Sequence, residues 1–394
     1  MDTTQKKLLI TGTIVLENEL VENSYVIING EKIEAVGMNS TIPENFQGEI
    51  IQYNEPIYVA PGFIDVHIHG ANGADTMDAT TEAIDTMAQA LVKEGTTSFL
   101  ATTITQEKSA IERALENVAD YVKNHNKRGK AEVVGIHLEG PFINPVRKGA
   151  QPEQYIIDPS VDQFKQWQEI AEGNIKLVTL APEQSGGYEL IQYLSENGVI
   201  PSIGHTDANY TEVEKAVKVG ASHVTHLFNG MKGVHHREPG TAGAALLFNE
   251  LNVELIVDGF HLRPEMVDLV VRVKGTDKIT LVTDAMRAKC LKNGVSELGG
   301  QKVIVKDGKA VLEDGTLAGS ILKMKDSVKN MTRFAKISLP EAVKLASMNP
   351  ARELHIDDRK GSLEPGKDAD IVVLNKDYEP ILTICRGTIA YKGD

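Results

Sequence analysis

Residues 60–70 are Ala60-Pro61-Gly62-Phe63-Ile64-Asp65-Val66-His67-Ile68-His69-Gly70, a run that predicts a β-strand ending in two histidines. Its aromatic and β-branched residues favour a strand, and the glycines that follow favour a turn. Residues two apart in a strand point to the same side, so His67 and His69 face one point. Histidine is the commonest metal-ligating side chain. The pair therefore indicates half of a metal site, although polar residues on a solvated strand face alternate in the same way.

The composition of the chain is that of a globular protein. Of 394 residues, 41% are hydrophobic and 24% charged, enough for one large α/β domain and a smaller one. The net charge of −14 argues against nucleic-acid or membrane partners. Cys290 and Cys385 fit no zinc or redox spacing. The polar N-terminus and the lack of a run of roughly 20 apolar residues lead us to expect a cytoplasmic protein.

Strand and helix patterns alternate through residues 58–351. The predicted strands end at His69, Thr102, Glu139, Ala181, His205, His226, Asp258 and Asp284. Amphipathic segments of helical length separate most of them, so the region predicts a parallel (β/α)₈ barrel of the TIM type. An open, doubly wound sheet is the competing architecture, but it usually needs a Gly-rich phosphate turn after its first strand. The chain has no such turn.

The two ends of the chain share a β character that the middle lacks. Residues 1–57 contain short apolar runs separated by turns, among them the strong hairpin signal Asn29-Gly30. Residues 352–394 return to strand patterns. We expect these two segments to pair into one small β-sandwich domain beside the barrel. A further hairpin is predicted over Leu298–Leu317, inserted after the last barrel strand.

Polar residues occupy the strand ends at which a barrel of this type places its active site. They are His67, His69, Glu139, His205, His226 and Asp284. Each alone could be a polar rim residue. Burying so many ionisable groups without a partner would cost several kcal/mol. A cation removes that cost, and imidazole and carboxylate ligands suit Zn²⁺ or Fe²⁺.

Seven motifs along the chain occur in a fixed order: His67-Ile68-His69-Gly70, His137-Leu138-Glu139-Gly140-Pro141-Phe142, Gly204-His205-Thr206, Thr225-His226-Leu227-Phe228-Asn229, Arg237-Glu238-Pro239-Gly240, Asp258-Gly259-Phe260-His261 and Thr283-Asp284-Ala285. Together they resemble the N-acetylglucosamine-6-phosphate deacetylases of the amidohydrolase superfamily, from about residue 8 to the C-terminus. The resemblance implies hydrolysis of N-acetyl-D-glucosamine 6-phosphate to D-glucosamine 6-phosphate and acetate, in amino-sugar catabolism or cell-wall recycling.

The resemblance also implies which residues bind metal. Glu139, His205 and His226 match the principal ligands of the family. His67 and His69 match the superfamily's pair for a second ion, which some members of this family lack. We therefore expect one or two divalent ions per subunit, zinc or iron, with Glu139 as the bridging ligand.

Substrate contacts follow from the same resemblance. Asn229, Gly230 and His261 match positions that hold the sugar phosphate. Arg237 matches an arginine that reaches the phosphate in the neighbouring subunit, which implies a homodimer. Gln151 stands where some members have a histidine that polarises the substrate carbonyl. A glutamine amide can donate a hydrogen bond there, but it carries no charge.

Asp284 matches the catalytic acid/base, which takes a proton from water and gives it to the leaving amine. Other polar residues receive no chemical role. We expect His137 to be a satisfied core histidine and His223 to lie on the strand face opposite His226. His235 and His236 flank Arg237 and could add positive charge near the phosphate.

Two other kinds of function stay open at this point. Another amidohydrolase, such as an N-acetylgalactosamine-6-phosphate deacetylase or a cyclic amidase, would share the fold. A cyclic amidase needs a site for a substrate carboxylate, whereas Asn229, Arg237 and His261 favour phosphate. A non-catalytic interaction protein would have lost metal ligands, and here every ligand position is filled. Acetate release from metal-loaded protein separates these alternatives.

Overall fold

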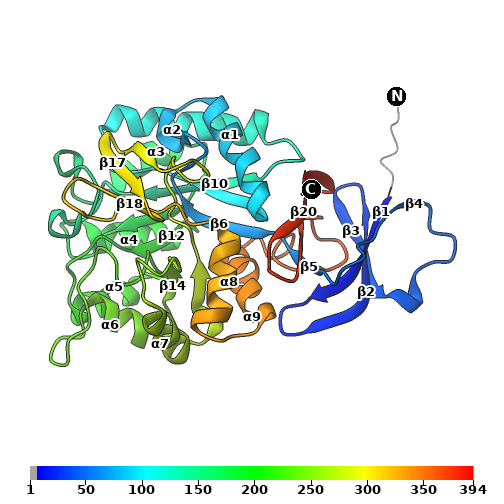
Figure 1. Ribbon diagram of the computed structural model, residues 1–394. Coiled ribbons are helices and arrows are strands. Elements are labelled where there is room, and N and C mark those ends of the chain that lie inside the picture. The colour runs from blue at the N-terminus through cyan, green and yellow to red at the C-terminus, as the bar shows by residue number, and fades with distance from the viewer. Residues whose placement is uncertain (1–6, 394) are drawn as a thin grey trace.

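The computed structural model describes residues 7–393 and contains a barrel beside a small sheet domain (Figure 1). Eight parallel strands form the barrel: β6 (Phe63–Ile68), β9 (Thr96–Thr102), β10 (Glu132–Glu139), β11 (Ile175–Leu180), β12 (Ile200–Ile203), β13 (His223–Val224), β14 (Asn252–Leu255) and β15 (Ile279–Leu281). The first and last strands meet just beyond their ends, where Ile68 bridges Ala285 and the Asp284 N–H donates to the His67 carbonyl at 2.8 Å. The predicted (β/α)₈ barrel is confirmed.

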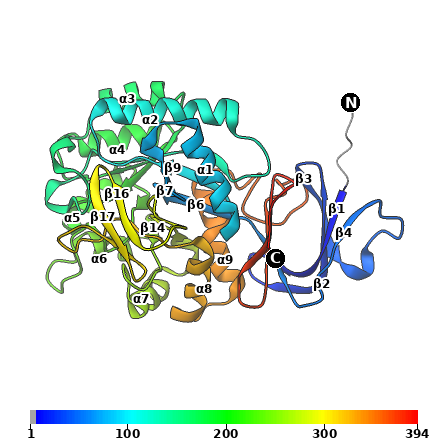
Figure 2. The same ribbon diagram turned by 45° about the horizontal axis from the view of Figure 1, so that its top comes forward.

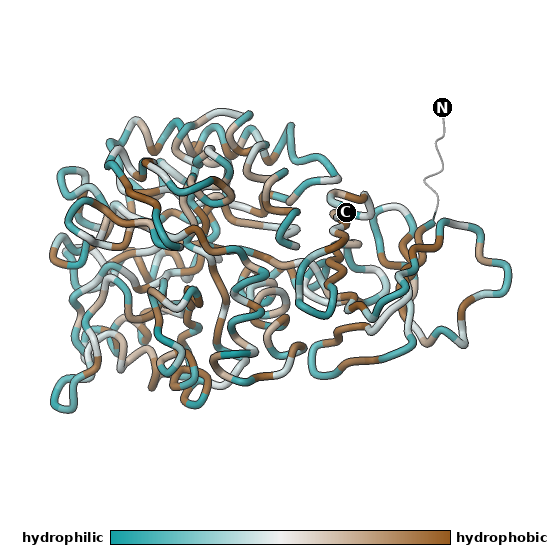
Figure 3. Tube along the Cα trace, in the orientation of Figure 1, coloured by the Kyte–Doolittle hydropathy of each residue, from teal (hydrophilic) through white to brown (hydrophobic). Residues whose placement is uncertain are grey.

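Helices surround the barrel and turn their apolar faces inward. They are α1 (Thr81–Leu91), α2 (Lys108–Asp120), α3 (Val161–Ile170), α4 (Gly187–Glu196), α5 (Tyr210–Lys218), α6 (Gly240–Leu247), α7 (Pro264–Lys274), α8 (Met324–Phe334), α9 (Leu339–Ala346) and α10 (Met348–Glu353). In α2, Ile111, Leu115 and Val118 lie at helical spacing and are buried. In Figure 3 the inner strands are mainly coloured as hydrophobic residues and the peripheral loops as hydrophilic ones. None of the helices within residues 7–393 is both long and apolar enough to cross a bilayer.

Both ends of the chain contribute to the small sheet, as expected. Its path is β21-β20-β19-β5-β1-β2-β3, and β4 pairs with β1. The strands are β1 (Lys7–Val15), β2 (Leu20–Asn29), β3 (Lys32–Met38), β4 (Gly48–Ile51), β5 (Tyr58–Pro61), β19 (Ile371–Leu374), β20 (Pro380–Cys385) and β21 (Thr388–Lys392). Because β5 pairs with both β1 and β19, it joins the N-terminal and C-terminal parts.

The stretch Ala60–Gly70 is divided between the end of β5, the whole of β6 and the first residue of β7, whereas the sequence predicted one strand. The chain leaves the small sheet at the end of β5 and enters the barrel with β6. Gly62 makes this passage possible, because a Cβ at this position would lie 2.2 Å from the Thr97 hydroxyl oxygen. Its N–H donates to the Asp370 carbonyl at 2.9 Å. The break thus lets one run of sequence serve both sheets.

Two short insertions border the mouth of the barrel. The hairpin strands β7 (Gly70–Ala71) and β8 (Ala74–Asp75) follow β6 directly. After the last barrel strand, β16 (Gly294–Leu298), β17 (Gln301–Lys306) and β18 (Lys309–Val311) form a three-stranded antiparallel sheet. The sequence predicted a hairpin over Leu298–Leu317, which covers β17 and β18, so the prediction missed β16. Figure 2 shows β16 and β17 in front of the barrel.

A buried ion network joins the barrel to the small domain. Glu132, at the start of β10, accepts two hydrogen bonds from Arg359 at 3.0 Å each. The Lys360 ammonium lies 2.7 Å from Glu132 and also pairs with Asp370. The Lys360 side chain is only 1% exposed. Buried charges persist when they are paired in this way.

Candidate metal centre and active site

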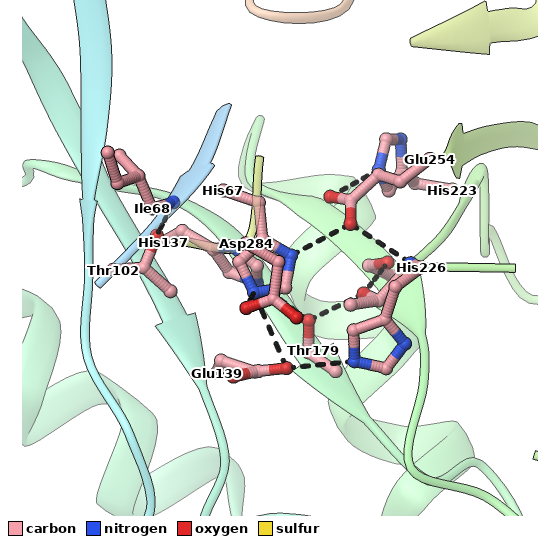
Figure 4. A network of polar contacts seen from close by, with 12 residues as sticks. His67, Ile68, Thr102, His137, Glu139, Thr179, His223, His226, Glu254 and Asp284 are labelled. Atoms are coloured by element: carbon pink, nitrogen blue, oxygen red, sulfur yellow. Dashed lines mark hydrogen bonds and ion pairs between the residues drawn. The ribbon is translucent and has the colours of Figure 1, made fainter. Parts of the chain in front are cut away.

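Six ionisable side chains converge at the mouth of the barrel, and Figure 4 shows four of them, His67, Glu139, His226 and Asp284. Each belongs to the C-terminal end of a barrel strand or to the residues directly after it, and none is more than 8% exposed. They are His67 and His69 at β6, Glu139 at β10, His205 after β12, His226 after β13 and Asp284 after β15. The six residues predicted from the sequence therefore lie together.

Three of these residues have a left-handed backbone. His205, His226 and Asp284 have φ angles of 46°, 31° and 47°. A non-glycine residue in this region costs on the order of 1–3 kcal/mol and persists only where its surroundings enforce it. At Asp284 the enforcement is visible, because its N–H donates to His67 and its carbonyl accepts from the Ser320 N–H at 2.7 Å. Such strain clusters at functional sites.

Glu139 is the common neighbour of the four histidines. Its Oε1 lies 3.2 Å from His205 Nε2 and 3.1 Å from His226 Nε2. The same oxygen is 3.5 Å from His67 Nε2, and Oε2 is 3.1 Å from His69 Nε2. Two groups of potential metal ligands thus share this carboxylate: Glu139 with His205 and His226, and Glu139 with His67 and His69.

The first group fits a divalent cation. His205 Nδ1 lies 2.8 Å from the Arg147 carbonyl, and His226 Nδ1 lies 3.1 Å from the Asn229 carbonyl. Because a carbonyl only accepts, Nδ1 of each ring carries a proton and Nε2 is the nitrogen left to bind an ion. The two Nε2 atoms are 3.2 Å apart and both face Glu139 Oε1. Three electron-pair donors that face one point are stabilised by a cation.

The second group, Glu139 with His67 and His69, also fits a divalent cation. His67 Nδ1 lies 2.8 Å from Glu254 Oε2, which only accepts, so Nδ1 carries a proton and Nε2 is the nitrogen left to bind an ion. That nitrogen is fully buried and has no hydrogen-bond partner among the described residues. It faces Asp284 Oδ1 at 3.4 Å, and His69 Nε2 lies 3.3 Å from the same oxygen. These atoms could hold a second ion.

Burial and neighbouring charges shift the pKa values of these groups in opposite directions. Burial raises the pKa of Glu139, but the surrounding imidazoles bring it well below its usual range. The same opposition lowers the pKa of Asp284, so both are carboxylates at neutral pH. Burial lowers the pKa of His69, but Asp284 and Glu139 raise it to about 9. A bound cation supplies the same compensating charge and displaces these protons.

A cavity of about 200 Å³ opens directly above the ligands. It is lined by His69, Ile104, Glu139, Gly149, Ala150, Gln151, His205, His226, Asn229, Gly230, His261, Asp284, Leu298, Thr316, Leu317 and Gly319. The insertion that carries β16–β18 supplies part of this wall through Leu298 and Leu317. Four of the five substrate-binding residues expected from the sequence therefore line the cavity.

Gln151 and His261 have fixed orientations in this cavity. Gln151 Oε1 accepts from the Thr105 N–H at 2.8 Å, so its amide N–H₂ faces Glu139 Oε2 at 3.0 Å. His261 Nδ1 lies 2.7 Å from Asp258 Oδ2. Burial lowers the pKa of His261, but Asp258 raises it above its usual value. Both side chains can donate hydrogen bonds to a ligand.

Arg237 lies apart from this cavity. Its side chain is exposed, and its guanidinium Nη1 is 2.8 Å from His236 Nε2. It is not among the described residues that line the cavity. His235 and His236 are exposed beside it. The structure of this chain therefore brings together every expected site residue except Arg237.

Sequence reasoning missed Glu254 on β14. Its carboxylate is fully buried and contacts His67, His223 and the backbone of His226. His223 was expected to point away from the site, and it lies between Glu254 and Glu353. One signal was available, because Glu254 is the only acidic residue in the apolar run at residues 251–257.

The fold and the site together define a hydrolase of the amidohydrolase class with candidate metal ligands at the mouth of its barrel. The amidohydrolase family model matches residues 58–390. The chain is 49% identical over 379 residues to the N-acetylglucosamine-6-phosphate deacetylase of Bacillus subtilis (strain 168), covering 96% of this chain and 95% of that protein. The chain therefore belongs to the amidohydrolase family and, within it, to the N-acetylglucosamine-6-phosphate deacetylases.

Two further relatives bear on the substrate. The N-acetylgalactosamine-6-phosphate deacetylase of Escherichia coli O157:H7 is 36% identical, over 80% of this chain and 83% of its own. A mutant N-acetyl-D-glucosamine-6-phosphate deacetylase from Mycobacterium smegmatis has been solved in complex with N-acetyl-D-glucosamine-6-phosphate. That structure is 30% identical and superposes with a TM-score of 0.92, covering 98% of this chain and 100% of the other.

The shared position of Glu139 predicts how bound metal responds to mutation. His67→Ala should lower the metal content of the purified protein by one ion per subunit, because it removes a ligand of only one group. Glu139→Gln should remove nearly all bound metal, because both groups lose their anionic ligand. Elemental analysis after dialysis measures this, with the exposed Glu153→Gln variant as the control. Unchanged metal in Glu139→Gln would exclude this centre.

Proposed function

We propose that the protein hydrolyses the acetamide of N-acetyl-D-glucosamine 6-phosphate, yielding D-glucosamine 6-phosphate and acetate. One observation carries the proposal: a buried set of four histidines and two carboxylates borders a cavity large enough for part of a sugar. The chain surrounding this set is 49% identical to a deacetylase that bears this substrate in its name. The reaction belongs to amino-sugar metabolism.

Glu139, His205 and His226 would hold one divalent ion, zinc or iron, and His67 and His69 would complete a second site. Such an ion supplies a Lewis acid that activates water and polarises the amide carbonyl. The protein contributes the geometry. The Nδ1 atoms of His205 and His226 are held by backbone carbonyls. Both rings therefore already direct Nε2 at the site and need no reorientation before the ion binds.

Asp284 is the proposed acid/base. Neighbouring imidazoles keep it ionised, since they lower its pKa despite its burial. It can therefore accept a proton from the attacking water. The resulting carboxylic acid then gives that proton to the amine nitrogen, which leaves only when protonated. The left-handed backbone at Asp284 holds the side chain over the cavity for both steps.

Gln151, Asn229, Gly230 and His261 are the proposed substrate contacts. The amide of Gln151 already presents its N–H₂ group towards the ligands, where it can donate to a carbonyl oxygen. His261 has a raised pKa, which favours a charged donor for hydroxyl or phosphate oxygens. Gly230 has φ 59° and lies against His205, with 3.0 Å between its would-be Cβ and Nδ1, so its backbone can approach a ligand closely.

Arg237 supports a homodimer with shared active sites. It is the one expected phosphate contact that its own subunit keeps out of the cavity. Its exposed guanidinium, flanked by two histidines, is free to reach a neighbouring subunit. Arginine presents a planar fork that matches phosphate oxygens. We place the enzyme in the cytoplasm, because a phosphorylated sugar does not cross membranes unaided.

The galactosamine epimer is a second candidate substrate. A relative named for that substrate is 36% identical to this chain. The 49% identity to a glucosamine-specific name favours the gluco epimer. Both phosphorylated epimers therefore belong in the substrate panel, and the larger kcat/KM identifies the preferred one.

The substrate itself provides the direct test. N-acetylglucosamine 6-phosphate should be hydrolysed at least about 10²-fold more efficiently than free N-acetylglucosamine, because charge-assisted hydrogen bonds to phosphate contribute roughly 1.5–3 kcal/mol each. Acetate release measures kcat/KM for both sugars. Arg237→Ala should remove most of this preference and barely change the rate on the free sugar. Equal values in the unmutated enzyme would refute the phosphate assignment.

Asp284→Asn should lower kcat by a factor on the order of 10² or more, because an amide cannot shuttle the proton. KM should change less. Steady-state kinetics on the metal-loaded variant tests this, and elemental analysis confirms that the ions are retained. The exposed Asp377→Asn variant is the matched control. A variant with metal bound and near-normal kcat would move the acid/base role to another residue.

Subunit mixing tests the shared active site. Asp284→Asn subunits and Arg237→Ala subunits should regain activity on the sugar phosphate when they exchange into heterodimers. In such a heterodimer, one site has an intact Asp284 of its own and an intact Arg237 from its partner. Mass-tagged subunits verify the exchange, and each unmixed variant serves as the control. Complete exchange without recovered activity would assign Arg237 to its own subunit or to no phosphate contact.

A further inference from the structure

We propose that Glu254 is a positioning residue that holds His67 in the tautomer required to bind a metal ion and fixes the backbone at His226. The inference rests on the proposed metal-dependent function. Glu254 is the third residue of β14 and is fully buried in the barrel interior. Its carboxylate contacts His67 and the backbone of His226, and it is not among the described residues that line the cavity (Figure 4).

One oxygen of Glu254 contacts both halves of the metal centre. Oε2 accepts from His67 Nδ1 at 2.8 Å and from the backbone N–H of His226 at 3.0 Å. The first contact places a proton of His67 on Nδ1 and turns Nε2 towards Glu139, so that Nε2 is the nitrogen available to a metal ion. The second contact holds His226 where its backbone has the strained φ of 31°. Glu254 thus orients a ligand on each side of Glu139.

Glu254 is itself held by His223. Its other oxygen lies 3.0 Å from His223 Nε2, and His223 Nδ1 lies 2.9 Å from Glu353 Oε1. An imidazole between two carboxylates donates from both nitrogens and is therefore charged. Burial lowers the pKa of His223, but Glu353 and Glu254 raise it to about 10. The imidazolium balances the buried charge of Glu254 and leaves it no freedom to rotate.

These contacts form a chain from the floor of the barrel to its mouth. Glu353, the last residue of α10, also accepts from the Thr280 hydroxyl at 2.9 Å. It lines a second cavity, of about 360 Å³, with residues from the N-terminal ends of the barrel strands. From there the chain passes through His223 and Glu254 to His67. The orientation of His67 is therefore fixed by residues on three elements other than its own strand.

Without Glu254, His67 would lose its only Nδ1 partner among the described residues. The ring could then adopt the other tautomer, in which Nε2 carries a proton and cannot bind metal. Partners of this kind typically change metal affinity by about 10- to 100-fold. His205 would be untouched, and His226 would keep its bond to the Asn229 carbonyl. The loss should therefore fall mainly on the ion held by His67 and His69.

Zn²⁺ titration calorimetry on full-length protein stripped with a chelator tests this proposal. Glu254→Leu should weaken the binding step assigned to His67 and His69 by about 100-fold, and the Glu139–His205–His226 step by less than about 10-fold. The binding step that is lost in His67→Ala is assigned to the His67–His69 site. Glu254→Gln should recover part of the affinity, with a loss of about 10-fold, because its amide oxygen can still accept from His67. If Glu254→Leu fails to fold, the Gln variant carries the test alone.

Glu94→Gln is the matched control. Glu94 is also a buried, paired carboxylate, bonded to Lys289 at 2.6 Å, but it touches no proposed ligand. It should lose stability without altering either Zn²⁺ step. Three results would overturn the proposal: wild-type protein with a single step, Glu254 variants with unchanged steps, or an equal weakening in Glu94→Gln. The titration contains no sugar, so an inactive enzyme with the expected binding pattern would refute the deacetylase function alone.

Discussion

The shared carboxylate of Glu139 is the constraint on which the mouth of the barrel depends. One side chain, 2% exposed, must face four imidazoles at 3.1–3.5 Å. Its neighbours come from three other strands, so those strands must end at a matching height around the barrel. The bond from the Asp284 N–H to the His67 carbonyl closes the ring at that height. The geometry of the ligands and the closure of the barrel thus both depend on where the strands end.

Much of this arrangement could be predicted from local patterns. His67 and His69 share a face because strand side chains alternate, and Glu139 ends a strand whose apolar run is plain in the sequence. Glu254 could not be assigned in the same way. Its partners come from β6 and from the segment around β13, and only the register between strands brings them together. Periodicity within one strand contains no information about that register.

The break at Gly62 and the position of Arg237 could not be read from local patterns either. The break at Gly62 arises because Thr97, more than thirty residues later, leaves no room for a side chain. A run of β-forming residues looks continuous whether or not a neighbour interrupts it. Arg237 matches a phosphate-binding position, yet its own chain does not place it at the cavity. The sequence around Arg237 contains nothing that distinguishes a residue acting in its own cavity from one acting elsewhere.

Charge explains how this protein can hold an anionic substrate. The chain carries a net charge of −14, which repels a phosphate at long range. At the cavity the balance differs, because burial strengthens every local interaction and solvent screens distant charge. Metal ions bound to the buried ligands would add positive charge there, and the pKa of His261 is already raised. The deep end of the cavity would therefore be more positive than the net charge of the chain suggests. A phosphate at the rim would then need a further cation, and we propose that Arg237 of a second subunit supplies it without burying another charge.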